Sequence, residues 1–239
     1  MKTVIDDRYR QQSDEIVRLP ERMAAGEGEM VYDSRNRVVR FRLGDEPVLV
    51  KRFKRVNAIQ QVAYTFFRPS KAERAYRFAD EFLRRGIATP RRVAYMEQRR
   101  WGLFSVGYFV SCEAAGTETS LLLREVQDYP PALAEAVARQ VVLMHSRGVL
   151  HGDLNLSNFL CTDDDGYHFT MIDINRSHFT DGWPTDEQCL ENMVRLTHRR
   201  DLYEDLVRRY ARLRQWDADV TAARALALLD RFEHRRIRL

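Results

Sequence analysis

The chain has 239 residues, of which 44% are hydrophobic and 31% charged, and its formal net charge is +4. This length and composition predict a globular protein with a sizeable core, organised as one large domain or two small lobes. Apolar runs fall far short of the roughly 20 residues of a spanning helix, and the first residues lack the apolar core of a secretory signal. We therefore expect a protein that folds and works in the cytoplasm.

Basic residues gather in short stretches although Lys and Arg exceed Asp and Glu only slightly, 39 against 35. A solvated surface explains the small excess, whereas the clustering favours an anionic partner such as a phospholipid surface or a phosphorylated glycolipid. Nucleic acid is disfavoured because no stretch shows a groove-reading motif or aromatic interleaving. Three cysteines without paired metal spacing favour reduced thiols.

The first part of the chain is predicted to be rich in strands. Residues 1–28 are polar and are expected to be an N-terminal extension, a strand or loop ahead of a fold that begins near Glu29. Alternating apolar residues separated by turn residues predict an antiparallel meander. Its strands are 30–33, 38–43 and 47–53.

One helix and two more strands complete this strand-rich lobe, which we place at residues 29–112. Apolar residues at three- and four-residue spacing predict a helix from about Ser70, which ends before Gly86. This is the one helix expected after the third strand. The further strands are predicted at 92–97 and 101–112.

The second lobe, residues 113–239, is predicted to be mostly helical. Pro130 and Pro131 suit the first turn of a helix that ends before Gly148. Three further helices, the last forming a helical tail, are predicted at 186–198, 200–213 and 219–235. A long stretch broken by two short apolar runs separates the first helix from these. Long loops inside a compact domain are usually functional.

That stretch begins His151-Gly152-Asp153-Leu154-Asn155-Leu156-Ser157-Asn158 and continues to Met171-Ile172-Asp173. An Asp, an Asn five positions later, and a hairpin that delivers a second Asp resemble the catalytic and metal-binding loops of protein-kinase-like enzymes. In that arrangement Asp153 faces the acceptor hydroxyl, and Asn158 shares a metal with Asp173. The resemblance implies an α+β, two-lobed fold with a small antiparallel N-lobe and a helical C-lobe. It also implies ATP and Mg²⁺ as cofactors.

Upstream, Val48-Leu49-Val50-Lys51 is an apolar strand that ends in a cation, like the third strand of a kinase N-lobe. By this resemblance Lys51 binds the nucleotide α- and β-phosphates and is oriented by Glu73 on the following helix; Glu81 and Glu97 fit less well. Two plain alternatives stay open. Lys51 could be an exposed lysine among other cations, and Glu73 could belong to a capping box begun by Ser70.

Three other polar features have competing interpretations. His151 is expected to pack and to hydrogen-bond to backbone instead of acting as a base. The run Asp163-Asp164-Asp165 with Gly166 predicts a solvated hairpin turn instead of a metal cluster. Arg176 is a candidate contact for an anionic acceptor, with an ion pair to a local acid as the alternative.

Two departures from protein kinases narrow the resemblance. Gly152 stands where regulated protein kinases usually carry Arg, and Ile174-Asn175-Arg176 replaces the usual Phe-Gly, which removes the pivot of an activation switch. With Gly86-Ile87-Ala88-Thr89-Pro90-Arg91, residues 29–180 resemble the lipopolysaccharide core kinase family. Its members phosphorylate Kdo or heptose at the cytoplasmic face of the bacterial inner membrane. The resemblance implies a lipid-linked core sugar as acceptor and peripheral contact with the anionic inner membrane.

Two other functions remain open at this stage. An aminoglycoside-type phosphotransferase shares the His-Gly-Asp sequence and differs in its acceptor. A pseudokinase scaffold is favoured by the missing glycine-rich loop, since Arg35 or Arg37 and backbone amides would then have to cover the phosphates. The intact set of Lys51, Asp153, Asn158 and Asp173 argues against a scaffold.

Overall fold

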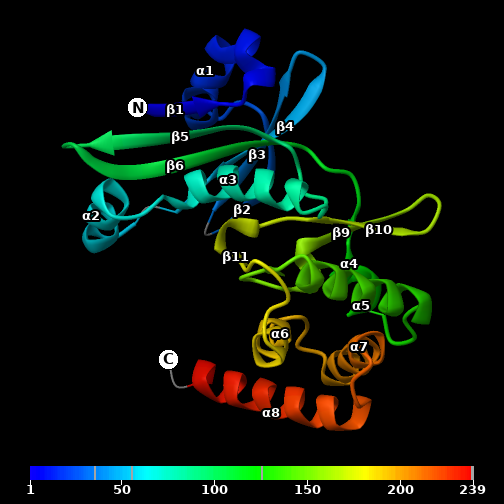
Figure 1. Ribbon diagram of the computed structural model, residues 1–239. Coiled ribbons are helices and arrows are strands. Elements are labelled where there is room, and N and C mark those ends of the chain that lie inside the picture. The colour runs from blue at the N-terminus through cyan, green and yellow to red at the C-terminus, as the bar shows by residue number, and fades with distance from the viewer. Residues whose placement is uncertain (35, 55, 125, 238–239) are drawn as a thin grey trace. The chain divides into compact units, whose positions relative to one another are not determined.

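The computed structural model describes residues 1–34, 36–54, 56–124 and 126–237 (Figure 1). The chain forms two compact units. The first unit consists of Met1–Glu81 and Pro90–Ala114, and the second of Phe82–Thr89 and Ala115–Leu239. None of the helices in the described parts of the chain is long and apolar enough to cross a membrane.

The first unit is built on a six-stranded antiparallel sheet with strand order β1-β5-β6-β4-β3-β2. Its side chains alternate between the two faces, as the pleat requires. Val48 and Val50 of β4 are fully buried on the face that receives helix α1 (Ser13–Ala24). Helix α3 (Lys71–Arg84) covers the opposite face (Figure 1). The strands are β1 (Lys2–Ile5), β2 (Glu29–Asp33), β3 (Arg37–Leu43), β4 (Glu46–Arg52), β5 (Arg92–Arg100) and β6 (Leu103–Cys112).

The expectation that residues 1–28 are an extension ahead of the fold is wrong. Strand β1 pairs with β5, and Ile16 and Leu19 of α1 are buried in the core of the sheet. Asp6 accepts hydrogen bonds from Arg8 and Arg92, and these guanidinium groups hold its pKa at about 2. The apolar residues of α1 follow a helical spacing that its charged face and the internal Pro20 obscure in the sequence.

Two helices, not one, follow β4. Helix α2 (Ala58–Phe66) starts at Asn57, whose side chain accepts a hydrogen bond from the Gln60 N–H at 2.9 Å. Because much of its apolar surface is exposed, α2 lacks the polar-outside pattern that marks a helix in a sequence. The strands predicted in this unit and helix α3 are confirmed, with ends shifted by a few residues.

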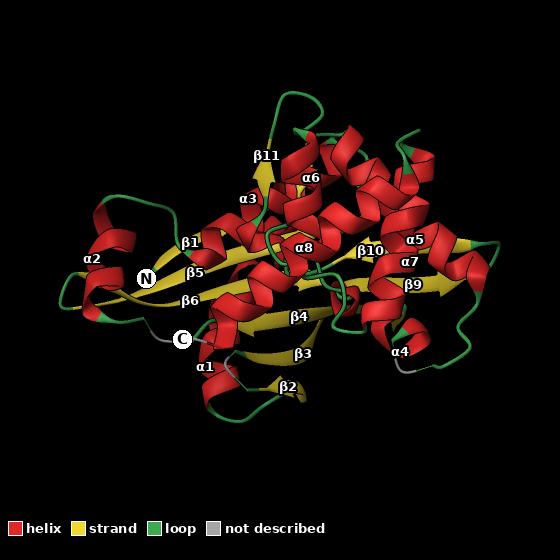
Figure 2. Ribbon diagram, turned by 90° about the horizontal axis from the view of Figure 1, so that it is seen from below, coloured by secondary structure: helices red, strands yellow, loops and turns green. Residues whose placement is uncertain are grey.

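The second unit is mostly helical, as predicted. Its core joins α5 to α7 through side chains such as Val141, Met144, Tyr203 and Tyr210, all fully buried. Figure 2 shows the helices in red beside the short strands. The elements are β7 (Thr117–Glu118), α4 (Thr119–Leu123), α5 (Pro131–Ser146), β8 (Val149–Leu150), β9 (Phe159–Asp163), β10 (Tyr167–Met171), β11 (His178–Phe179), α6 (Asp186–Met193), α7 (Arg200–Leu213) and α8 (Ala218–Ile237).

Two boundaries in this part of the chain differ from the prediction. Residues 82–89 belong to the second unit because the Thr89 hydroxyl donates to the Met171 carbonyl at 2.7 Å and Met171 N–H donates to Ala88. Helix α6 ends at Met193, not near His198. After the helix, the carbonyl of Leu196 accepts a hydrogen bond from the N–H of Leu156, a residue of the predicted catalytic loop.

Candidate active site

The loop between β8 and β9 is organised around His151, which is fully buried. Its Nε2 donates to the Ile172 carbonyl at 2.9 Å, and its Nδ1 accepts from the Asp153 N–H at 3.2 Å. Burial lowers the pKa of the imidazole, which keeps it neutral in this tautomer. His151 therefore links the backbones of the two predicted loops, as expected of a structural histidine.

Asn158 and Asp173 are brought together by the backbone. The Ile172 N–H donates to the Asn158 carbonyl at 3.0 Å. The Asn158 side-chain nitrogen donates to the Asp153 carbonyl at 2.7 Å, so the amide oxygen is the end that can bind a cation. Three of the predicted polar residues are thus connected within the second unit.

Asp173 has an unusual backbone conformation. Its φ is +58° and its ψ is +38°, a left-handed geometry that Asp and Asn tolerate better than most residues. Its Oδ1 accepts a hydrogen bond from the Asn175 side chain at 2.7 Å. The turn of Ile174–Arg176 that follows closes against the loop of Gly152.

The donor set fits Mg²⁺. A carboxylate from Asp173 and an amide oxygen from Asn158 are hard oxygen ligands, and Mg²⁺ typically completes its shell with waters and substrate phosphates. In the described part of the chain no group of three or more His, Cys, Asp or Glu side chains is gathered for a metal. Asp163, Asp164 and Asp165 instead form the exposed end of the β9–β10 hairpin, as predicted.

Two arginines flank the Asp153 carboxylate. The guanidinium of Arg176 lies 3.7 Å from Oδ2, and that of Arg195 lies 3.9 Å from Oδ1. All three side chains are partly exposed, with 53% for Arg176, 46% for Arg195 and 34% for Asp153. The predicted ion pair of Arg176 with a local acid is therefore present, and the acid is Asp153 itself.

Gly152 has no room for a side chain. A Cβ at this position would lie 2.0 Å from the carbonyl oxygen of Arg176 and 2.5 Å from its carbonyl carbon. The obstruction is backbone, which cannot move away as a flexible side chain would. This close approach explains why Gly stands where regulated protein kinases usually carry Arg.

Replacing Gly152 with Ala is expected to cost about 1–3 kcal/mol of stability by forcing the two loops apart. The melting temperature should then fall by roughly 2–4 °C for each kcal/mol. Gly182→Ala is the matched control, since a Cβ at Gly182 meets no atom within 4 Å. Thermal unfolding of both variants tests this; equal melting temperatures would contradict the packing argument.

A buried hydrogen-bond chain supports the loop from below. The Asn192 side chain on α6 donates to the His151 carbonyl at 2.8 Å and accepts from His145 Nε2 at 3.2 Å. His145 Nδ1 accepts from the Tyr210 hydroxyl at 2.8 Å. Burial lowers the pKa of His145 to about 4, so the imidazole is neutral at physiological pH. Helices α5, α6 and α7 thereby fix the position of the loop.

Lys51 and Glu73 lie in the first unit. On β4 Lys51 is paired with Phe109 of β6, and it shares with Phe109 the face of the sheet that α3 covers. The buried Glu73 belongs to that same helix. Its N–H donates to the Ser70 hydroxyl at 3.2 Å, which confirms the backbone half of the predicted cap.

The Glu73 carboxylate contacts cations from β1 and from its own helix. Lys2 lies 3.1 Å from its Oε2, and Arg77 contacts its Oε1. Lys2 comes from β1, which the sequence did not place in this sheet. The pairing of Glu73 with Lys51 stays a prediction. Of the two arginines proposed to cover the phosphates, Arg37 pairs with Asp33 at 2.9 Å, and Arg35 lies outside the described residues.

Comparison with known proteins decides the family. A model of the lipopolysaccharide kinase (Kdo/WaaP) family matches residues 50–209, well over half of the chain. The chain belongs to this family. The match includes Lys51, Asp153, Asn158 and Asp173, and confirms the resemblance proposed from the sequence.

Two relatives of this Kdo/WaaP family member are informative. The lipopolysaccharide core heptose(I) kinase WaaP of Pseudomonas aeruginosa is 32% identical over 111 residues, an alignment that spans 41% of each chain. A solved structure of WaaP in complex with acyl carrier protein superimposes with a TM-score of 0.63 at 22% identity, covering 98% of this chain and 99% of that one. The structural match confirms the predicted two-lobed, protein-kinase-like fold.

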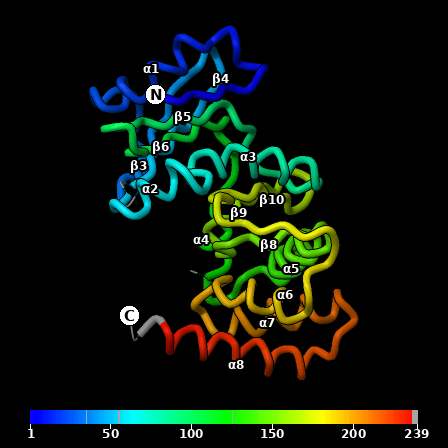
Figure 3. Tube along the Cα trace, turned by 60° about the vertical axis from the view of Figure 1, so that its left-hand side comes forward, coloured from blue at the N-terminus to red at the C-terminus, as the bar shows by residue number. Residues whose placement is uncertain are grey.

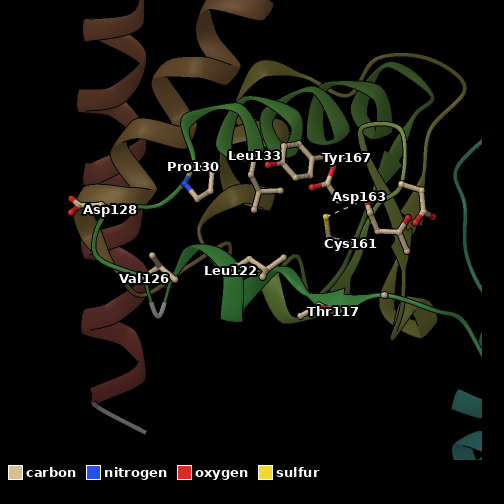
Figure 4. A pocket seen from close by; sticks show the side chains of 12 residues that line it. Thr117, Leu122, Val126, Asp128, Pro130, Leu133, Cys161, Asp163 and Tyr167 are labelled. Carbon is tan, nitrogen blue, oxygen red and sulfur yellow. Dashed lines mark hydrogen bonds between the residues drawn. The ribbon is translucent and has the colours of Figure 1, made fainter.

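A separate pocket of about 640 Å³ lies elsewhere in the second unit of this Kdo/WaaP family member (Figure 4). Its lining includes Leu122, Val126 and Leu133 together with Asp163 and Tyr167, and Figure 4 shows Leu133 beside Tyr167. None of the predicted site residues lines it. This pocket is therefore distinct from the predicted catalytic and metal-binding loops.

Proposed function

We propose that this protein transfers the γ-phosphoryl group of ATP to a hydroxyl of Kdo or heptose in the lipopolysaccharide inner core. The observation that carries the proposal is the loop cluster of Asp153, Asn158 and Asp173, tied by the Asn158–Asp153 and Ile172–Asn158 hydrogen bonds. Family membership supports the acceptor class.

In the proposed mechanism each residue has one task. Asp153 orients the acceptor hydroxyl in line with the γ-phosphate and accepts its proton late in the step. Lys51, oriented by Glu73, contacts the α- and β-phosphates. Mg²⁺, bound by Asn158 and Asp173, would neutralise charge on the phosphates. Because the transition state is loose, positioning and electrostatics supply most of the acceleration.

Arg176 and Arg195 extend this mechanism to the acceptor. Guanidinium groups match carboxylates and phosphates, which are the anions that a Kdo sugar or a phosphorylated core presents. At 3.7 and 3.9 Å from the Asp153 carboxylate, both arginines are ion-paired without a short hydrogen bond. These contacts support our proposal that both arginines bind an anionic group of the acceptor next to Asp153.

Arg176→Gln and Arg195→Gln are each expected to raise KM for the core acceptor about tenfold, because each loses roughly the binding free energy of one hydrogen bond to a charged group. The change in kcat should be smaller. Arg139→Gln removes an exposed arginine of α5 paired with Glu135 and serves as the control. Steady-state kinetics test this. A fall in kcat at constant KM would show that the two arginines act only by positioning Asp153.

A direct assay tests the activity itself. The purified protein is incubated with ATP, Mg²⁺ and either dephosphorylated core oligosaccharide or a panel of aminoglycosides, and products are identified by mass spectrometry. Transfer to the core sugar supports the proposal, and transfer to aminoglycosides alone would replace it. Thermal stabilisation by ATP and Mg²⁺ without transfer to any acceptor would favour the pseudokinase scaffold.

A further inference from the structure

One end of the first unit exposes large apolar side chains. Ile59 and Phe67 are each 81% exposed, Phe66 is 68% exposed, and Val62 on the same helix is 40% exposed. Trp101, at the tip of the β5–β6 hairpin, is 89% exposed. We call these five residues the α2 patch. Large apolar side chains gathered on one exposed surface are typical of an interaction site.

The helix and the hairpin form one surface. The Phe104 N–H, three residues beyond Trp101, donates to the Thr65 hydroxyl at 2.8 Å, and the rings of Tyr64 and Phe104 lie 5.3 Å apart. All three views show α2 beside the β5–β6 end of the sheet (Figures 1, 2 and 3). The buried side of α2 thus anchors it to β6, while its other side carries the patch.

Basic residues flank the α2 patch in the sequence, and the segment that forms α2 contains no acidic residue. Between Glu46 and Glu73 the sequence contains no Asp or Glu. Exposed basic residues lie before and after α2 in the chain and immediately before Trp101 on the hairpin. They are Lys54, Arg68, Arg99 and Arg100.

We infer that the α2 patch inserts into the headgroup region of an anionic phospholipid bilayer. Aromatic and aliphatic side chains on one face of a helix, flanked by Lys and Arg, are typical of interfacial membrane binding, and Trp is enriched at that depth. Each nearby cation adds attraction to anionic lipid. The inference rests on the proposed function for its biological setting, because the lipid-linked acceptor proposed above lies in an anionic bilayer.

A second copy of the chain fits the patch less well. In a two-fold dimer the same surface meets itself, so the basic residues next to the patch would face identical basic residues of the second copy. The segment between Glu46 and Glu73 offers no carboxylate to pair with them. An anionic lipid surface supplies the complementary charge.

The test is cosedimentation of the full chain with vesicles of phosphatidylcholine, with and without phosphatidylglycerol. Ile59→Ser/Phe66→Ser/Phe67→Ser should lower the partition coefficient by a factor on the order of 100, because three inserted side chains become polar. Met30→Ser/Leu121→Ser/Val220→Ser is the matched control, with residues 49%, 52% and 58% exposed on other elements. Arg99→Gln/Arg100→Gln should lower binding roughly 25-fold, and only to anionic vesicles.

Phosphorylation of a water-soluble core oligosaccharide should be unchanged in every variant, which separates failure of this inference from failure of the proposed function. Equal sedimentation of wild type and the α2 triple variant would overturn it, as would equal binding of wild type to neutral and anionic vesicles. Absence of vesicle binding by wild type, or a dimer in solution that the triple variant loses, would also overturn it.

Discussion

Asp153→Asn is expected to lower kcat by about 10² to 10⁴ while ATP binding persists. The substitution keeps the size of the side chain and removes the carboxylate that orients the acceptor hydroxyl and receives its proton. The loop should survive, because Asn158 bonds to the backbone carbonyl of residue 153 and His151 bonds to its N–H. Single-turnover transfer and calorimetric ATP titration measure the two quantities separately.

Asp164→Asn is the matched control for this variant. It makes the same chemical change at an exposed residue of the β9–β10 turn in the same unit. The control should retain wild-type turnover. Wild-type phosphorylation by Asp153→Asn would disprove the assignment of Asp153, whereas loss of both transfer and ATP binding would indicate that the loop had collapsed.

The site residues that the sequence predicts lie close together in the chain. Asp153 and Asn158 lie five residues apart in one loop, and Asp173 follows on the next hairpin, so a short spacing carries the whole pattern. The same holds for helices α5 and α7, whose buried apolar residues recur at helical spacing, and α5 also has proline at its start and Gly148 after its end. These elements are confirmed.

Residues that are distant in the sequence but contact the site could not be recognised from the sequence pattern. Arg195 lies beside Asp153 only because the chain turns after Met193, and Asn192 supports His151 from helix α6. Each is one ordinary polar residue in a charged stretch of the sequence. Their roles depend on packing between elements, which periodicity does not encode.

Two of the helices that the sequence analysis missed, α1 and α2, were missed for different reasons. In α1 the buried residues Ile16, Leu19 and Met23 are at helical spacing, but the segment is rich in charged residues and contains Pro20, which favoured a strand or loop ahead of the fold. In α2 several large apolar residues are exposed, so the assumption that the apolar side of a helix faces the core does not identify it. The second failure coincides with the surface for which we infer a lipid partner, as expected where function overrides folding patterns.

Asp173→Asn is expected to weaken Mg²⁺-dependent ATP binding by about a hundredfold or more, because the only carboxylate proposed to hold the metal becomes neutral. Asn is the informative substitution, since it tolerates the left-handed backbone at φ +58°, whereas Ala would add strain of about 1–2 kcal/mol. Melting temperature should therefore stay near wild type in Asp173→Asn and fall in Asp173→Ala.

Titration of ATP with and without Mg²⁺ distinguishes a metal ligand from a structural residue at this position. If Asp173 binds the metal, Asp173→Asn loses the difference between the two titrations while keeping the weak metal-free binding. Asp165→Asn, in the exposed β9–β10 turn, should keep the full difference. If Asp173→Asn bound ATP and Mg²⁺ as tightly as wild type, the metal site would have to be sought elsewhere, and Asn158 would lose its proposed role with it.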